Sequence, residues 1–103
     1  MHLVYILYNP IIDKYYIGET ENIERRIMEH NTGFFEKSYT AFNSGWELKR
    51  TIKLNDRTNA RKIESYIKNM KSKKYLFNLI SDEAFYKKFI NIVHEKFDII
   101  IID

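Results

Sequence analysis

The sequence is poor in residues that cross-link or interrupt a chain. Among its 103 residues there is no cysteine, one proline and three glycines. The lack of cysteine excludes a disulfide framework, a thiolate metal site and a cysteine nucleophile, and it fits a reducing compartment. Because proline and glycine are scarce, most of the chain is free to form regular helices and strands.

Long hydrophobic runs are also missing. Runs such as Leu3–Tyr8 and Ile99–Ile102 are far shorter than the ~20 residues that span a bilayer. The amino-terminal residues lack the basic segment and apolar stretch of a signal peptide. With 45% hydrophobic and 30% charged residues, the composition is that of one globular domain. We therefore expect a soluble, cytoplasmic protein that makes no membrane contact.

The charge is modest in total but uneven along the chain. The net charge is +3, yet residues 49–74 contain ten Lys and Arg against two Asp and Glu, a net charge of +8. The flanking residues 1–48 and 75–103 carry −3 and −2. This basic block is either a solvated face or a track for the phosphate backbone of a nucleic acid, and we favour the track. Its members are Lys49, Arg50, Lys53, Arg57, Arg61, Lys62, Lys68, Lys71, Lys73 and Lys74.

Apolar periodicity predicts three strands. β-Branched and aromatic residues fill 3–8 and 14–18, which should pair as an antiparallel hairpin across the turn residues 9–13. Residues 33–46 are expected to be a loop. A third strand is predicted over 46–54, with apolar positions at Trp46, Leu48, Ile52 and Leu54.

Three helices are expected between and after these strands. The first begins at Thr20 as N-cap and ends near Asn31, and the second covers 58–72 with an apolar stripe at 3–4 spacing. The third covers 81–96. The apolar segment 75–80 between the last two helices contains a single Asn, Asn78.

The tail, residues 97–103, has a strand-like composition. Left uncovered, it would be an aggregation hazard. We expect it to pack as an extra strand or to join a homodimer interface.

Five polar residues fall where these elements could bring them together. Tyr5 and Tyr16 lie in the hairpin strands, and Arg26 and His30 are one helical turn apart. Glu64 lies at the margin of the second helix's apolar stripe. Singly, each has an ordinary structural explanation as a core aromatic, a solvated helix face or a boundary residue. No glycine-rich phosphate loop or His-Glu-x-x-His motif is present.

As an ordered set, these residues resemble the GIY-YIG endonuclease family. Leu3-Val4-Tyr5 stands where the family has its first tripeptide, and Tyr16-Ile17-Gly18 is the second, intact. The run from Tyr16 to Asn31 is similar to the following signature, with its Arg and His. Ala60 and Glu64 resemble the Ala-x-x-x-Glu of the second helix, and Asn78 matches a late Asn. The resemblance covers about residues 3–80.

The resemblance implies an α+β fold with a three-stranded antiparallel sheet flanked by helices. Residues 1–80 would form the nuclease core. Residues 81–103 would add a C-terminal helix and an apolar tail, both packed on the same domain. A terminal strand is one conformation open to that tail.

The implied activity is metal-dependent endonucleolytic hydrolysis of DNA. Glu64 would hold one Mg²⁺ (or Mn²⁺), and Tyr5 would act as general base or position the attacking water. Tyr16 would share that network, Arg26 would stabilise charge on the phosphate, and His30 would support the same centre. Gly18, Thr20 and Asn78 would be supporting residues. One carboxylate is few for Mg²⁺, so metal binding should be weak until substrate phosphate oxygens arrive.

The departures leave alternatives open. Leu3 replaces a family glycine, and Glu19 would either repel the substrate backbone or hold Arg26. The chain could instead be a non-catalytic nucleic-acid-binding module, or a subunit whose activity another protein completes. The expected substrate is DNA, in branched or structured form among others. A protein partner could supply specificity, since a single domain has little room for its own targeting.

Overall fold

The fold is built on an antiparallel sheet. The computed structural model describes residues 1–32 and 44–102. Its three strands are β1 (His2–Asn9), β2 (Lys14–Thr20) and β3 (Glu47–Leu54), in the order β2-β1-β3. Both pairings are antiparallel, and Tyr5 on the central strand lies opposite Gly18 on β2 and Thr51 on β3. The predicted hairpin is confirmed, and the predicted loop over 33–46 lies largely outside the described residues.

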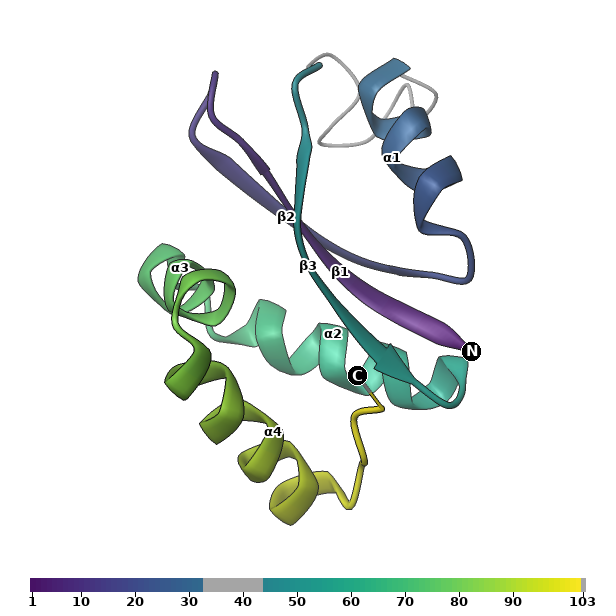
Figure 1. The fold of residues 1–103 in the computed structure, drawn as a ribbon, viewed down its shortest axis with the longest axis vertical. Coiled ribbons are helices and arrows are strands. Elements are labelled where there is room, and N and C mark those ends of the chain that lie inside the picture. The colour runs from purple at the N-terminus through teal and green to yellow at the C-terminus, as the bar shows by residue number, and fades with distance from the viewer. Residues whose placement is uncertain (33–43, 103) are drawn as a thin grey trace.

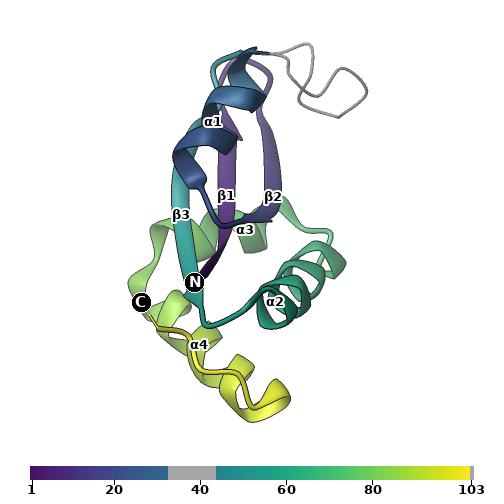
Figure 2. The same cartoon turned by 90° about the vertical axis from the view of Figure 1, so that its right-hand side faces the viewer.

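Helices cover both faces of this sheet (Figures 1 and 2). On one face, α1 (Ile23–Thr32) packs its partly buried isoleucines, Ile23 and Ile27, against Tyr5, Leu7 and Trp46. On the other face, α2 (Arg57–Asn69), α3 (Lys73–Ser81) and α4 (Glu83–Phe97) form the larger core. The α+β architecture expected from the sequence is therefore confirmed. Among the described residues, no helix is both long and apolar enough to cross a membrane.

A bulge divides the apolar residues of β3 between the two faces. Ile6 pairs with Arg50 but Leu7 pairs with Leu48, so Lys49 is an extra residue on β3. Because one extra residue reverses side-chain alternation, Trp46 joins the α1 side whereas Ile52 and Leu54 join the larger core. The third strand predicted over 46–54 is therefore confirmed as β3, with its alternation interrupted at Lys49.

The first helix starts later than expected. Thr20 is the last residue of β2, and its hydroxyl accepts a hydrogen bond from the Asn22 backbone N–H at 3.0 Å. The side-chain oxygen of Asn22 in turn accepts the N–H of Arg25 at 3.1 Å, as an N-cap does. Thr20 therefore orders the turn before the helix, and its prediction as N-cap was wrong.

The C-terminal region contains a helix that the sequence analysis did not predict. Residues 73–81 form α3, whose first turn is capped by the Ser72 hydroxyl accepting from the Tyr75 N–H at 3.1 Å. After α4, Asp98 takes a left-handed conformation with φ 55°, which ends the helix.

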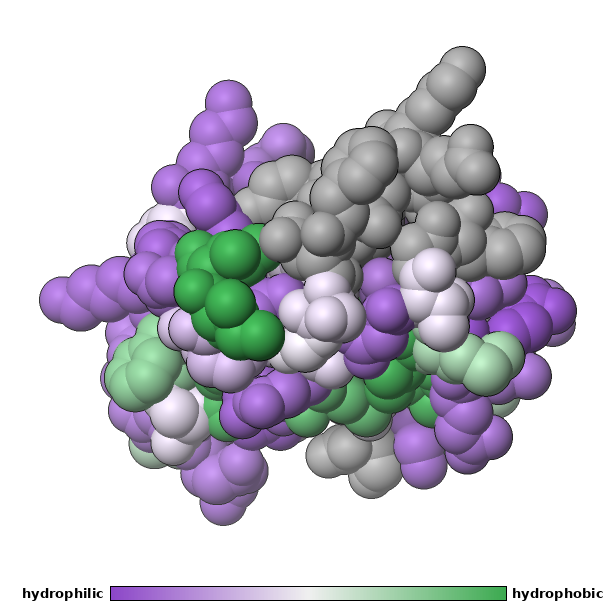
Figure 3. Space-filling view, turned by 90° about the horizontal axis from the view of Figure 1, so that it is seen from above, coloured by the Kyte–Doolittle hydropathy of each residue, from purple (hydrophilic) through white to green (hydrophobic). Residues whose placement is uncertain are grey.

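The tail then crosses back to the sheet. Ile99 is buried in the larger core, and the N–H of Ile102 donates to the Lys53 carbonyl of β3 at 2.9 Å. Residues 98–102 form no regular strand, so the tail covers the core as an irregular segment. The outer surface seen in Figure 3 is mainly hydrophilic, with small hydrophobic patches.

Candidate active site

The two candidate tyrosines lie together on the face of the sheet that α1 covers. Tyr5 is central on β1 and Tyr16 lies on the edge strand β2, with ring centroids 6.2 Å apart. Opposite Tyr5, Gly18 leaves room for the phenol, because a Cβ at Gly18 would overlap the hydroxyl and lie 2.6 Å from Cζ. The missing side chain lets the Tyr5 ring lie over β2.

His30 closes this cluster from α1. Its Nε2 is 3.0 Å from the Tyr5 hydroxyl, its ring centroid is 4.7 Å from that of Tyr16, and the residue is only 2% exposed. Burial, together with the nearby charge of Arg26, lowers the pKa of His30 to about 4. Burial and the neighbouring Tyr16 raise the pKa of Tyr5 well above its ordinary value. Near neutral pH the pair is therefore a neutral phenol and a neutral imidazole.

Arg26 lies one turn before His30 on α1, with a side chain that is 33% exposed. Its guanidinium Nη1 is 3.9 Å from Glu29, one turn further along the same helix. The positive charge of Arg26 acts to lower the pKa of both Tyr5 and Tyr16, although burial outweighs it. Arg26 thus supplies a cation at the edge of the phenol cluster, where it remains open to solvent.

Glu64 approaches the cluster from the other side of the sheet. Helix α2 packs on the opposite face from α1, yet the charge of Glu64 acts to raise the pKa of both Tyr5 and Tyr16. Because β2 is an edge strand, the carboxylate can approach past its outer side. The Glu64 side chain is 17% exposed, and its Oε2 lies 3.5 Å from Nζ of Lys68.

The donor set fits a divalent cation that binds weakly by itself. Within the described part of the chain, no group of three His, Asp or Glu residues converges to hold a metal. Glu64 offers one carboxylate, and Mg²⁺ commonly keeps several waters and takes substrate phosphate oxygens as further ligands. The residues present are therefore compatible with a metal whose coordination is completed by water and substrate.

Glu19 forms ion pairs with two other residues and lines a cavity together with Arg26, and its charge acts to raise the pKa of Tyr5. It lies 2.9 Å from Nε2 of His2 and 3.5 Å from Nε of Arg57. In the sheet register Glu19 is opposite Val4, which belongs to the larger core on the α2 side. Glu19 therefore links the start of β1 to the start of α2.

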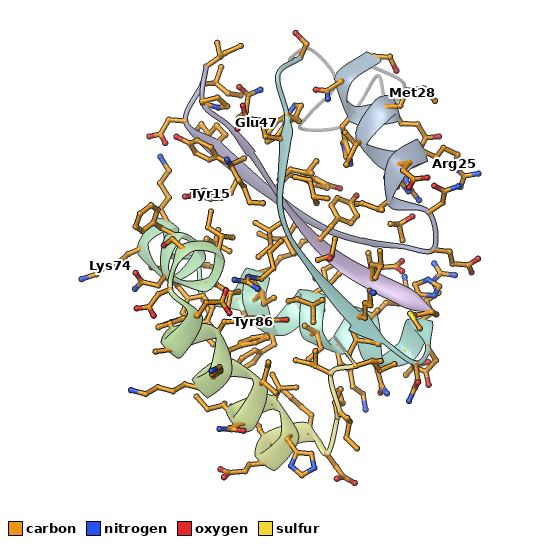
Figure 4. All side chains as sticks on the ribbon, in the orientation of Figure 1. Tyr15, Arg25, Met28, Glu47, Lys74 and Tyr86 are labelled. Carbon is orange, nitrogen blue, oxygen red and sulfur yellow. The ribbon has the colours of Figure 1, made fainter. Side chains whose placement is uncertain are left out.

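The basic block does not form one continuous track. Arg50 lies within the fold, with its guanidinium 3.8 Å from the Tyr86 ring centroid and 3.0 Å from Glu83 (Figure 4 shows Tyr86 between α4 and the sheet). The others are distributed over several surfaces. Cavities beside α2 and α3 are lined by Arg57 in one case, by Arg61 and Lys62 in another, by Lys68, Lys71 and Lys73 in a third, and by Lys49 in a fourth. The nucleic-acid-binding role of each residue stays a prediction.

Some site residues were not anticipated. Glu29 contacts Arg26, a pairing that the i to i+3 spacing on a helix could have indicated. Asn31 holds Trp46 with two hydrogen bonds, donating to its carbonyl at 3.2 Å and accepting its N–H at 2.8 Å. This clamp ties the end of α1 to the start of β3. Among the described residues, no hydrogen bond joins Asn78 to the cluster formed by Tyr5, Tyr16 and His30. The supporting role of Asn78 therefore stays a prediction.

The comparison with protein families identifies this arrangement. The model of the GIY-YIG catalytic domain matches residues 1–76, so the chain belongs to the GIY-YIG family, which is a nuclease family. Searches of curated proteins and of solved structures find no significant match.

Proposed function

We propose that this protein is a metal-dependent endonuclease that hydrolyses phosphodiester bonds of DNA. The observation that carries the proposal is the 3.0 Å contact between the Tyr5 hydroxyl and Nε2 of His30, beside Arg26 and Glu64. A buried phenol joined to a neutral imidazole is a route for one proton. Neighbouring cationic and anionic groups suit a phosphate and a divalent cation respectively.

The proton route avoids a buried phenolate. Because burial raises the pKa of Tyr5, the phenolate is a costly species in this site. In the His30 tautomer with its proton on Nδ1, Nε2 accepts a hydrogen bond from the Tyr5 hydroxyl, and the phenol oxygen can then accept one from the attacking water and orient it. The lowered pKa of His30, about 4, keeps Nε2 free to accept that hydrogen bond at neutral pH. Tyr16 packs against the imidazole and limits its movement.

The charged residues would serve the phosphate and the cation. Arg26 offers a planar fork of donors that matches phosphate oxygens. Glu64 would hold Mg²⁺ or Mn²⁺, which when bound supplies Lewis acidity at the phosphate and lowers the pKa of a bound water. Lys68, 3.5 Å from Glu64, balances the carboxylate charge when no cation is bound.

A cleavage assay tests the proposal. Supercoiled, single-stranded and branched DNA, and RNA, would be incubated with Mg²⁺ or Mn²⁺ and the wild type, Arg26→Ala or Glu64→Gln. Glu24→Gln, an exposed change on α1, is the matched control. We expect cleavage by the wild type and the control, and a loss of at least about a hundredfold in both site variants.

Three other outcomes would be decisive. Cleavage that survives in both site variants would refute the site assignment. Binding of DNA without cleavage in any metal would favour the non-catalytic module, and cleavage only after addition of a cell extract would favour a partner that completes the site.

A further inference from the structure

A cationic cavity lies next to Glu64, between β2 and the carboxyl end of α2. It measures about 350 Å³, and no acidic side chain lines it among the described residues. Tyr15 forms part of its wall from β2, and Figure 4 shows this ring on the side of the sheet toward α3. Four lysines line it: Lys14 on β2, Lys68 on α2, Lys71 in the turn after α2, and Lys73 on α3.

Lys68 links this cavity to Glu64 of the proposed active site. Lys68 follows Glu64 by one helical turn, about 6 Å along the axis, and the two side chains are in contact at 3.5 Å. The cavity also includes Ile17, the residue before Gly18 on β2. A strand with a phosphate near Glu64 would therefore place a neighbouring phosphate within reach of these lysines.

Two of the four lysines are available for a new partner. Lys68 faces Glu64, and Lys73 donates to Asp13 at 2.7 Å. Lys14 and Lys71 make no ion pair within the part of the chain that the structure describes. The charge of Lys14 also acts to lower the pKa of Asp13. Either lysine can neutralise a phosphate, which releases the counterions condensed on the nucleic acid.

The backbone at Lys71 adds an independent observation. Lys71 follows α2 with φ 48°, a left-handed position that glycine usually occupies after a helix. A lysine there is conformationally unfavourable, yet its side chain faces the cavity. The position thus carries a charge where the backbone alone would favour glycine.

A second cavity, between α1 and the start of α2, differs from the lysine cavity in the charges that line it. It measures about 280 Å³ and contains Arg25, Arg26 and Arg57. It also contains two carboxylates, Glu19 and Glu21. Its mixed charge makes it a poorer site for a second phosphate than the lysine cavity.

We propose that the lysine cavity binds a backbone phosphate of the nucleic-acid strand on one side of the cleaved bond. The inference rests on the proposed function, because the Tyr5–His30 cluster defines where that bond lies. Backbone phosphates carry no sequence information, so the cavity confers affinity and register rather than base preference. Lys14, which lies outside the basic block, thereby becomes a phosphate contact.

Binding rather than cleavage tests the proposal, so that it is separable from the enzymatic activity. Affinity for a fluorescent single-stranded DNA would be measured in EDTA over a range of salt concentrations. The double variant Lys14→Gln/Lys71→Gln would be compared with Lys87→Gln/Lys88→Gln, a pair of exposed lysines on α4 outside the basic block, which removes the same charge elsewhere. We expect the cavity variant to lose roughly tenfold in affinity and its salt slope to fall by about 0.7, the value for one phosphate of a single strand. The control should leave the slope unchanged.

A second variant separates binding from folding. Lys71→Gly relieves the left-handed strain, so it should weaken DNA binding without lowering the melting temperature. If the cavity and control variants lost equal DNA affinity, the effect would come from overall charge and the proposal would be overturned. Unchanged DNA affinity in the cavity variant would overturn it as well. Loss of binding confined to the cavity variant, in a protein that cleaves nothing, would support the cavity and refute only the nuclease proposal.

Discussion

Gly18 shows how one missing side chain can shape a site. The Tyr5 ring lies where a Cβ of residue 18 would be, with Cζ 2.6 Å from that position. We expect Gly18→Ala to lower the free energy of unfolding by about 1–3 kcal/mol, because the ring must shift within a packed cluster. Nuclease activity should fall by roughly a hundredfold as the Tyr5 hydroxyl leaves His30. Urea denaturation and cleavage rates would measure the two effects.

The double variant Tyr5→Phe/Gly18→Ala provides the control. Removing the hydroxyl takes away the atom closest to the new methyl group, so part of the lost stability should return. A Gly18→Ala protein with wild-type stability and activity would show that the phenol does not need this space.

His30 should make stability depend on pH in a defined window. Its pKa is about 4 in the folded protein, against ~6.5 for an unperturbed histidine. The unfolded chain therefore binds more protons between these values. The stabilisation is fully present above about pH 6.5 and is lost as pH falls toward 4, for a total of roughly 3 kcal/mol.

Denaturation at several pH values would test this titration. In the wild type, His30 should contribute up to about 1.4 kcal/mol per pH unit to the slope of unfolding free energy within that window. His30→Gln should reduce the slope, while other titrating groups still contribute to both proteins. If the two slopes were equal, His30 would not be buried in its neutral form.

Among the elements, α4 depends on a contact with β3. The Arg50 side chain is only 14% exposed, and its guanidinium lies between the Tyr86 ring and Glu83. We expect Arg50→Ala to cost about 1–3 kcal/mol of unfolding free energy, since it removes packing, a cation–π contact and an ion pair together. Lys53→Ala, an exposed change on the same strand, should stay within about 0.5 kcal/mol.

Arg50→Lys refines this prediction. A lysine keeps the charge but lacks the planar group that lies over Tyr86, so it should recover less than half of the loss. If Arg50→Lys recovered the full unfolding free energy, the charge alone would hold α4 on the sheet. If Arg50→Ala lost no unfolding free energy, the apolar residues of α4 would be enough to hold it. Urea denaturation would measure all three variants.

The elements differ in how well the sequence predicted them, for physical reasons. The hairpin and α2 follow from local patterns, because β-branched runs and a 3–4 apolar spacing each determine one face. Helix α3 was missed because residues 75–80 are apolar in succession, a pattern that does not separate helix from strand. The bulge at Lys49 was also missed, since pairing with β1 creates it and no residue type marks it.

At the scale of the whole molecule, the sequence predicted the members of the candidate site better than their arrangement. Tyr5, Tyr16 and His30 do converge, as the hairpin and first helix suggested. The effect of the Glu64 charge on both phenols depends on how α2 packs on the sheet, which no single segment determines. The basic block was likewise expected as one surface, but the fold distributes its residues among several.

At the scale of the whole chain, the C-terminal tail covers the larger core. Ile99 is 2% exposed in the larger core whereas Ile100 is 66% exposed. Ile99→Ala should therefore cost about 2–4 kcal/mol of unfolding free energy, while Ile100→Ala should change it by less than about 0.5 kcal/mol. Deleting residues 98–103 should cost at least as much as Ile99→Ala.

Light scattering on the same proteins would report the solution mass. A mass that falls in Ile100→Ala would show a homodimer formed through the tail, and equal stability losses in the two single variants would contradict the burial of Ile99 alone.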